Sequence, residues 1–361
     1  MNRIEKLRSR LAEEKLDGLL VSTGENRRYL SGFTGSYGWL LVTADRVALV
    51  TDGRYWAAVE ESCPQVELIR YLPARDKRMG VLVAPWLNGT RVLGFESRNL
   101  TVADLDELRQ DLGDRAELKP TENLVEELRQ VKDAHELEQL RRVAAIADRA
   151  FQRALPMLKV GITEQEFCAE LEHQLQKEGA RKPSFDSIVA SGPNGAYPHA
   201  GVTDRSIQAG ELITVDFGAL ADGYNSDITR TIWLGELEGE QEKLYRVVRR
   251  AHRAALDAIR PGVKAGDVDS VARDLIAEAG YGEAFSHGLG HGVGLAVHEL
   301  PRVRPGVETV LEPGMVVTVE PGIYLPGVGG CRVEDSVVVT GDGFEFLTHS
   351  PYQEKGPHPL G

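Results

Sequence analysis

The segment LITVDFGALADGYNSDITRTIW, residues 212–233, carries two aspartates in a stretch that otherwise predicts a buried β-hairpin. Asp216 lies inside an apolar, β-branched run, and Asp227 lies at the start of the next such run. An odd spacing along a single strand would place the two side chains on opposite faces of the sheet. Across a hairpin, both can point into one cavity, and this is the arrangement we expect.

Two glutamates occur in the same kind of context further along the chain. Glu320 ends a run of Val and Thr in GMVVTVEPGIYL (314–325), and Glu334 lies inside the predicted strand CRVEDSVVVT (331–340). A buried carboxylate is costly unless it is paired or binds a metal. Four carboxylates in one pocket would repel one another and take up protons. Two divalent cations would neutralise all four, so the set predicts a dinuclear metal site.

The segment SHGLGHGVGLAVHE, residues 286–299, adds three histidines among alternating glycines. One imidazole suffices as a metal ligand, and the other two can donate and accept protons. The glycines allow the backbone to approach a site closely. A dinucleotide-binding loop is the alternative interpretation, but the spacing is not GxGxxG followed by a helix.

A weak internal repeat surrounds these segments. Residues 154–180 align with residues 255–281 at a constant offset of 101, and both predict a helix, a glycine turn, a second helix and a terminal glycine. A capping box from Thr163 to Glu166 begins the second helix of the first copy. The repeat predicts two related α/β units that face each other across a cleft, although two similar helical hairpins could also arise by chance.

The first third of the chain differs in composition. Residues 1–120 contain 18 basic and 18 acidic side chains and no histidine, whereas all nine histidines and the net charge of −13 belong to the remainder. Apolar runs in residues 39–55 predict a β-hairpin, and helical patterns alternate with strands on either side. We therefore expect an α/β (α+β) protein with a small N-terminal domain at 1–122 and a catalytic domain at 123–361.

Composition excludes several classes of protein. The net charge of −13 argues against a nucleic-acid binder. The three cysteines form no CxxC pair, which argues against a disulfide framework or a zinc ribbon and suits a reducing compartment. No apolar run reaches the length of a signal peptide or a membrane span. A cytoplasmic protein without a membrane partner is the expectation.

Four motifs together resemble the proline-specific metallopeptidases, namely prolidase (Xaa-Pro dipeptidase) and aminopeptidase P. They are DFG–x8–D, HGLGHGVGLAVHE, TVEPGIY and RVED, and the similarity extends over nearly the whole chain. This family shares the pita-bread fold, with duplicated α/β halves, with methionine aminopeptidase and creatinase. The resemblance implies two divalent ions, with Mn2+ favoured and Co2+ or Zn2+ as alternatives, and it implies a homodimer.

The resemblance assigns roles residue by residue. The implied metal ligands are Asp216, Asp227, His291, Glu320 and Glu334, of which Asp227 and Glu334 would bridge both ions. Creatinase lacks this ligand set, and methionine aminopeptidases usually lack the N-terminal domain. The remaining implied site residues are His199, His287 and His298 near the reaction centre, Phe185 in the substrate pocket, Arg332 near the metals, and Arg302, with Arg304 as the alternative, for the substrate carboxylate.

The expected reaction is hydrolysis of an Xaa-Pro bond. Glu320 would take a proton from water and pass it to the proline nitrogen, and His298 would stabilise the oxyanion. We favour an Xaa-Pro dipeptidase. The alternatives are an aminopeptidase P that acts on longer peptides, a dinuclear hydrolase for another amide or ester, and a binding protein of the same fold that has no peptidase activity.

Overall fold

The computed structural model describes residues 2–76, 78–356, 358 and 359. It forms two compact units, Met1–Arg129 and Gln130–Gly361. The sequence placed the boundary between residues 122 and 123, before helix α6 (Leu124–Arg129). In the structure α6 packs against α1 (Arg3–Glu13). Arg129 Nη1, at the end of α6, also donates a hydrogen bond to Asn26 Oδ1 at 2.8 Å. These contacts assign α6 to the first unit.

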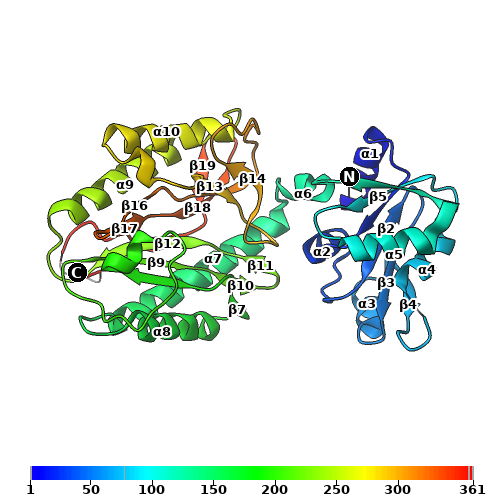
Figure 1. Cartoon of the computed structure of the whole chain (residues 1–361), viewed down its shortest axis with the longest axis horizontal. Helices are drawn as coiled ribbons and strands as arrows, with labels where there is room; N and C mark the ends of the chain where they lie inside the picture. Colours follow the sequence, from blue (N-terminus) through cyan, green and yellow to red (C-terminus); the bar gives the residue numbers. More distant parts are fainter. Residues whose placement is uncertain (1, 77, 357, 360–361) are drawn as a thin grey trace. The chain divides into compact units, whose positions relative to one another are not determined.

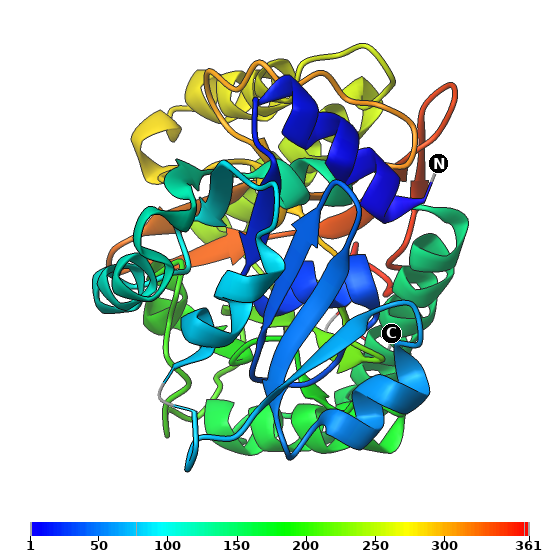
Figure 2. The same ribbon diagram turned by 90° about the vertical axis from the view of Figure 1, so that its right-hand side faces the viewer.

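The first unit is built around one six-stranded sheet, whose strands lie side by side in Figures 1 and 2. The sheet order is β4-β3-β2-β1-β5-β6, and the hairpin predicted within 39–55 is present as the antiparallel pair β2 and β3. The strands are β1 (Gly18–Val21), β2 (Trp39–Thr43), β3 (Val47–Asp52), β4 (Glu67–Tyr71), β5 (Val92–Glu96) and β6 (Glu117–Thr121). The connecting helices are α2 (Gly24–Ser31), α3 (Trp56–Ser62), α4 (Met79–Val83) and α5 (Val102–Leu112).

The second unit contains two helical hairpins, one on each side of a group of strands (Figure 1). Helix α7 packs on α8 and helix α9 packs on α10. The helices are α7 (Ala134–Ala154), α8 (Glu164–Lys177), α9 (Gly239–Ala258) and α10 (Ala265–Glu278). The strands that follow the first hairpin are β7 (Lys182–Pro183), β8 (Ile188–Ser191), β9 (Leu212–Phe217), β10 (Ala219–Ala221), β11 (Tyr224–Asn225) and β12 (Ile228–Trp233). Those that follow the second are β13 (Gly290–Gly292), β14 (Glu299–Val303), β15 (Val316–Val319), β16 (Gly322–Leu325), β17 (Gly329–Arg332), β18 (Asp335–Val339) and β19 (Phe344–Phe346).

The two hairpins repeat the same backbone design. Helices α8 and α10 begin and end at positions that match under the offset of the sequence repeat. The matched glycines before these helices, Gly161 and Gly262, have φ values of +93° and +87°, which a residue with a side chain rarely adopts. The turn between the two helices of each hairpin, here called its corner, is closed by a 2.8 Å backbone hydrogen bond. This bond runs from Ile207 N to Ile162 O before α8 and from Leu311 N to Val263 O before α10. The repeat is therefore a structural duplication.

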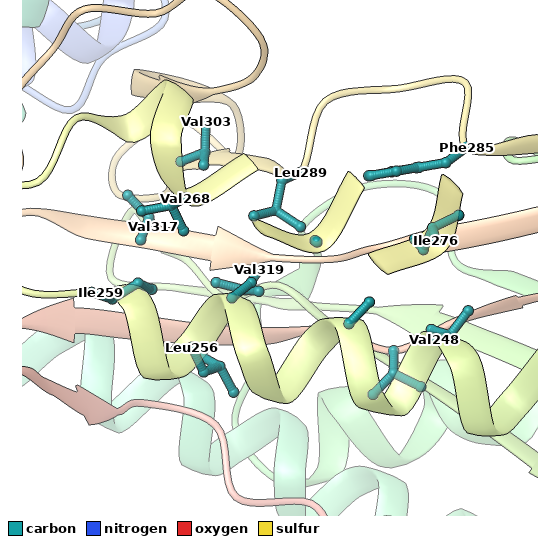
Figure 3. Close-up of a cluster of buried hydrophobic side chains, with 14 of the residues drawn as sticks. Val248, Leu256, Ile259, Val268, Ile276, Phe285, Leu289, Val303, Val317 and Val319 are labelled. Atoms are coloured by element: carbon teal, nitrogen blue, oxygen red, sulfur yellow. The ribbon is translucent and has the colours of Figure 1, made fainter. Parts of the chain in front are cut away.

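The core of the second hairpin fixes strand β15. Val248 and Leu256 of α9 pack in one buried cluster with Val317 and Val319 of β15 (Figure 3). Complete burial of a side chain of this size contributes roughly 1.5–3 kcal/mol. Because side chains alternate along a strand, Val317 and Val319 in the core direct Thr318 to the opposite face of β15.

Both glutamates lie where the chain leaves a strand. For Glu320 this is the expected position, because β15 ends at Val319 and β16 begins at Gly322. The predicted strand 331–340, in contrast, is interrupted after Arg332 and resumes at Asp335. At each break the chain passes from one sheet to another. The amide of Glu320 donates to Leu289 O at 2.8 Å, and that of Glu334 donates to Thr229 O at 3.0 Å. Glu334 thus lies between two strands, not inside one as predicted.

Candidate active site

All the predicted site residues line one cavity of about 780 Å3 in the second unit. The cavity wall combines residues from both halves of the duplication, as the sequence repeat suggested. Arg304, the alternative arginine, also lines it. The predicted residues in the wall are Phe185, His199, Asp216, Asp227, His287, His291, His298, Arg302, Glu320, Arg332 and Glu334.

The hairpin of β9 and β12 brings the two aspartates together. Asp216 on β9 pairs in register with Thr229 on β12, and Asp227 immediately precedes β12. An Arg332 Nη2 donates to Asp216 Oδ2 at 2.6 Å. Both aspartates line the cavity, which is the outcome expected from pairing across a hairpin.

A β-bulge and close backbone packing place His291. The register between β13 and β14 shifts between His291 and Gly292, and such bulges redirect a side chain. A Cβ on Gly290 would lie 2.1 Å from Thr318 O, so only glycine allows β13 to approach β15 this closely. His291 Nε2 then lies 3.7 Å from Asp227 Oδ2 and 3.2 Å from Glu320 Oε1.

The negative charges of Asp216, Asp227 and Glu334 are only partly balanced by neighbouring cations and hydrogen-bond donors. Burial raises the pKa of Asp227 and Glu334 well above the ordinary range, and neighbouring carboxylates raise both further. Burial also raises the pKa of Asp216, although Arg332 opposes this shift. Among the described residues, Asp216 Oδ1 and Glu334 Oε1 are buried without a hydrogen-bond partner.

These residues fit divalent cations. Ligand atoms of Asp227, His291 and Glu334 all lie within 4.8 Å of one another. Carboxylate oxygens with one imidazole form the hard donor set that suits Mn2+, Co2+ or Zn2+. Cations would satisfy the orphaned oxygens of Asp216 and Glu334 and remove the repulsion between the carboxylates.

His291 and Glu320 form a charged pair in this structure. Burial opposes the charge of His291, but the hydrogen bond and charge of Glu320 outweigh it and raise the pKa of His291 to about 9. Burial likewise opposes the charge of Glu320, yet His291 lowers the pKa of Glu320 to about 2. Glu320 is therefore a carboxylate at neutral pH.

The two flanking histidines are neutral at pH 7. Burial lowers the pKa of His298 to about 4, and the neighbouring His291, whose ring centroid lies 4.3 Å away, contributes to this shift. Burial also lowers the pKa of His287. His287 Nδ1 is within hydrogen-bond distance of Gly288 O at 2.8 Å, and Nε2 lies 3.0 Å from Tyr324 Oη.

Three residues that support the site were not predicted from the sequence. Thr229 Oγ1 donates to Glu334 Oε2 at 2.7 Å, and Thr318 Oγ1 donates to Glu320 Oε1 at 3.1 Å. Tyr324 Oη accepts from Arg332 Nη1 at 2.7 Å. The sequence contains enough information to predict the two threonines. Thr229 and Thr318 each lie two residues from a predicted ligand, and a spacing of two residues keeps side chains on one face of a strand.

Comparison with known proteins identifies the family. Residues 138–341 match metallopeptidase family M24, and residues 3–131 match the creatinase/prolidase N-terminal domain. The chain belongs to metallopeptidase family M24. The expected α/β (α+β) fold, with a small N-terminal domain before a pita-bread domain of duplicated halves, is thereby confirmed, as is the expectation of a metallopeptidase.

Relatives of this M24 peptidase are similar over almost their whole length. An Xaa-Pro dipeptidase from Pyrococcus horikoshii is 38% identical over 348 residues, which are 96% of each chain. The solved structure of an Xaa-Pro dipeptidase from Bacillus anthracis has 40% identity and a TM-score of 0.93, covering 97% of this chain and 98% of that one. That of an X-Pro aminopeptidase from Thermotoga maritima has 34% identity and a TM-score of 0.87, covering 97% and 98%.

Proposed function

We propose that this M24 peptidase hydrolyses the Xaa-Pro bond of dipeptides with the help of two divalent ions. The observation that carries the proposal is the convergence of four carboxylates and His291 in one cavity, with buried oxygens of Asp216 and Glu334 left unpartnered. The similarity to relatives named Xaa-Pro dipeptidase supports the choice of bond.

The proposed metal ligands are the five residues that the sequence suggested. When bound there, divalent ions would polarise the scissile carbonyl and lower the pKa of water toward neutrality. The ligands are Asp216, Asp227, His291, Glu320 and Glu334.

Glu320 is the proposed proton carrier of the reaction. With divalent cations bound it would be ionised at neutral pH, because the cations would take the place of the positive charge of His291, and Thr318 Oγ1 holds its Oε1 at 3.1 Å. A carboxylate in this state can accept a proton from water and pass it to the leaving proline nitrogen. His298, neutral at pH 7, can donate its N–H to the oxyanion that develops on the carbonyl.

The cavity suits a proline dipeptide because its lining residues can bind the proline without a hydrogen bond from the amide nitrogen. The X-Pro nitrogen has no N–H, so a site that depends on that donor fails on it. Phe185 offers an apolar surface for the ring, and His199 and His287 line the same cavity. Arg302, or its neighbour Arg304, can pair with the carboxylate of the proline, which favours dipeptides over longer chains.

The open alternatives differ in substrate. Aminopeptidase P activity would need room beyond the proline, where the proposal has Arg302 or Arg304 pair with the carboxylate of a dipeptide. A hydrolase for another amide or ester would share the metal site and lack the preference for proline. A binding protein without activity would be expected to lose ligands, and here every expected ligand type is present in the cavity wall.

We further propose Mn2+ as the physiological metal, a homodimer as the assembly, and the cytoplasm as the compartment. The hard, oxygen-rich donor set supports Mn2+, with Co2+ and Zn2+ as alternatives. The three cysteines are free thiols, which suits a reducing compartment. Among the described residues no helix is long and apolar enough to span a membrane. Light scattering after size-exclusion chromatography tests the dimer.

Three peptides assayed with added Mn2+ test the proposed function. Cleavage of Ala-Pro with little cleavage of Ala-Pro-Ala or Ala-Ala is the expected result. Cleavage of the tripeptide at a comparable rate would indicate aminopeptidase P, and cleavage of Ala-Ala would indicate a broader hydrolase. Glu320→Gln should abolish turnover, whereas Glu312→Gln, an exposed glutamate of the same unit, should not change it. Absence of turnover on all three peptides would overturn the proposal.

A further inference from the structure

A completely buried carboxylate outside the cavity holds one wall of it. Glu164, the first residue of α8, has no exposed surface and accepts hydrogen bonds at both of its oxygens. Its Oε1 accepts from Ser191 N and Ser191 Oγ, each at 2.7 Å. Its Oε2 accepts from Asn194 Nδ2 at 2.8 Å, from Thr203 N at 3.2 Å and from Thr203 Oγ1 at 2.7 Å.

These bonds join the two ends of one loop. Ser191 begins the segment 191–203 and Thr203 ends it, so a single carboxylate closes the loop by binding one end at each oxygen. The middle of the segment, including His199, lines the cavity. The His199 ring makes no hydrogen bond to another described residue. Its position in the wall therefore depends on the backbone that carries it.

The duplication within the chain shows that the α8 corner does not need this carboxylate. The matching first residue of α10 is Ala265, which is equally buried. Nevertheless, the corners are alike, with an antiparallel bridge from Thr163 to Ser206 in one half and from Lys264 to Val310 in the other. A side chain that is dispensable for the corner but makes five bonds to a loop serves that loop.

We propose that Glu164 is a positioning residue that holds His199 in the wall of the active-site cavity. It acts by closing the loop 191–203 and does not contact the substrate. The consequence for turnover rests on the proposed function, whereas the closure of the loop does not. A second interaction holds the middle of the loop beside the proposed metal ligands. Arg332 Nη1 donates a hydrogen bond to Pro198 O at 3.2 Å.

Glu164→Gln is the informative substitution because all of the groups that face Glu164 are donors. Whichever way the amide turns, its NH2 group faces the backbone N–H of Ser191 or Thr203, and neither N–H can reorient to accept. The matched control is Glu166→Gln on the same turn of α8. Among the described residues, the Glu166 side chain bonds only within the capping box with Thr163, a position at which glutamate and glutamine both occur.

Hydrogen–deuterium exchange of the full-length protein tests loop closure directly. Glu164→Gln should accelerate exchange in peptides from residues 192–203 while Glu166→Gln leaves them unchanged. Unaltered exchange in Glu164→Gln would overturn the proposal. If Glu164→Gln does not fold, Thr203→Val removes one of the five donors and should accelerate exchange in the same peptides, and an unchanged rate there would likewise overturn it.

A double-mutant cycle on Ala-Pro hydrolysis tests the path through His199. Glu164→Gln should lower kcat/KM by about 10- to 100-fold, because a misplaced site group costs a factor of this order. In a His199→Ala background the same substitution should have little further effect. Effects that multiply in the double variant would show a general structural role and contradict the proposal. Inactive wild-type protein would refute the proposed function, while the exchange experiment would still decide the role of Glu164.

Discussion

A buried ion pair at the end of the segment 286–299 supports a quantitative prediction about stability. Lys132 Nζ donates to Glu299 Oε1 at 2.7 Å, and the two side chains are 1% and 4% exposed. Glu299 directly follows His298, and its Oε2 accepts from Ala296 N at 3.3 Å. The substitution Lys132→Met keeps most of the side-chain volume but leaves the carboxylate of Glu299 buried without its cation.

The expected cost follows from the burial. Removing one partner of a buried pair destabilises a protein by about 3–5 kcal/mol, because the remaining charge is uncompensated. Since each 1.4 kcal/mol is a factor of ten, the slowest amides of β15 and β18 should exchange with deuterium roughly 100- to 4,000-fold faster. These strands belong to the same unit as Lys132, so their exchange reports on that unit alone.

An exposed pair of the same chemistry provides the control. Lys264 Nζ also lies 2.7 Å from Glu308 Oε2, but those side chains are 47% and 78% exposed. Lys264→Met should leave the exchange rates unchanged, because water and salt screen an exposed pair. Adding Glu299→Gln to Lys132→Met should recover part of the loss. Equal effects of the two lysine substitutions, or no effect of either, would refute the reasoning from burial.

Further predictions concern the core, the thiols and the metal. Leu256→Ala should lower the free energy of unfolding by about 2–5 kcal/mol in chemical denaturation, because Leu256 is buried in the cluster of Figure 3; a loss well below 1 kcal/mol would contradict that packing. Burial raises the pKa of Cys63, and that of Cys168 and Cys331 to about 12, so a thiol reagent at pH 8 should label them only after denaturation. Because unfolded thiols ionise at their ordinary pKa of 9.0, the same burial should make stability fall as pH rises above about 9, and chemical denaturation at several pH values between about 8 and 11 measures this fall. Glu334→Gln should weaken Mn2+ binding in calorimetry, and wild-type affinity in this variant would argue against its role as a ligand.

The sequence predicts that the site residues lie in one cavity. The reason is that each acidic residue occurs in a segment whose other residues should be buried. Asp216 and Glu334 occur among β-branched residues that must be buried, and a folded chain can bury such acids together only with partners or cations. The hairpin argument then brings Asp216 near Asp227, as the structure shows. The glycines of the segment 286–299 also allow close approach, but at Gly290 and Gly292 the close contacts are with the backbone of Thr318 and Leu300.

The sequence could not reveal features that depend on distant partners. The breaks at Glu320 and Glu334 follow from backbone bonds to Leu289 and Thr229, and neither partner is apparent from the local pattern. The role of Glu164 is equally hidden, because its local pattern shows only the first turn of a helix. Its bonds to a loop that begins at residue 191 arise from the tertiary fold.

Turnover of Ala-Pro during stepwise return of Mn2+ to chelator-treated protein tests the central claim most directly. The five proposed ligands and the cavity predict no turnover without metal and an increase in activity that reaches its maximum at two ions per chain. Full activity in the chelated protein, or no activity with two ions bound, would contradict the account.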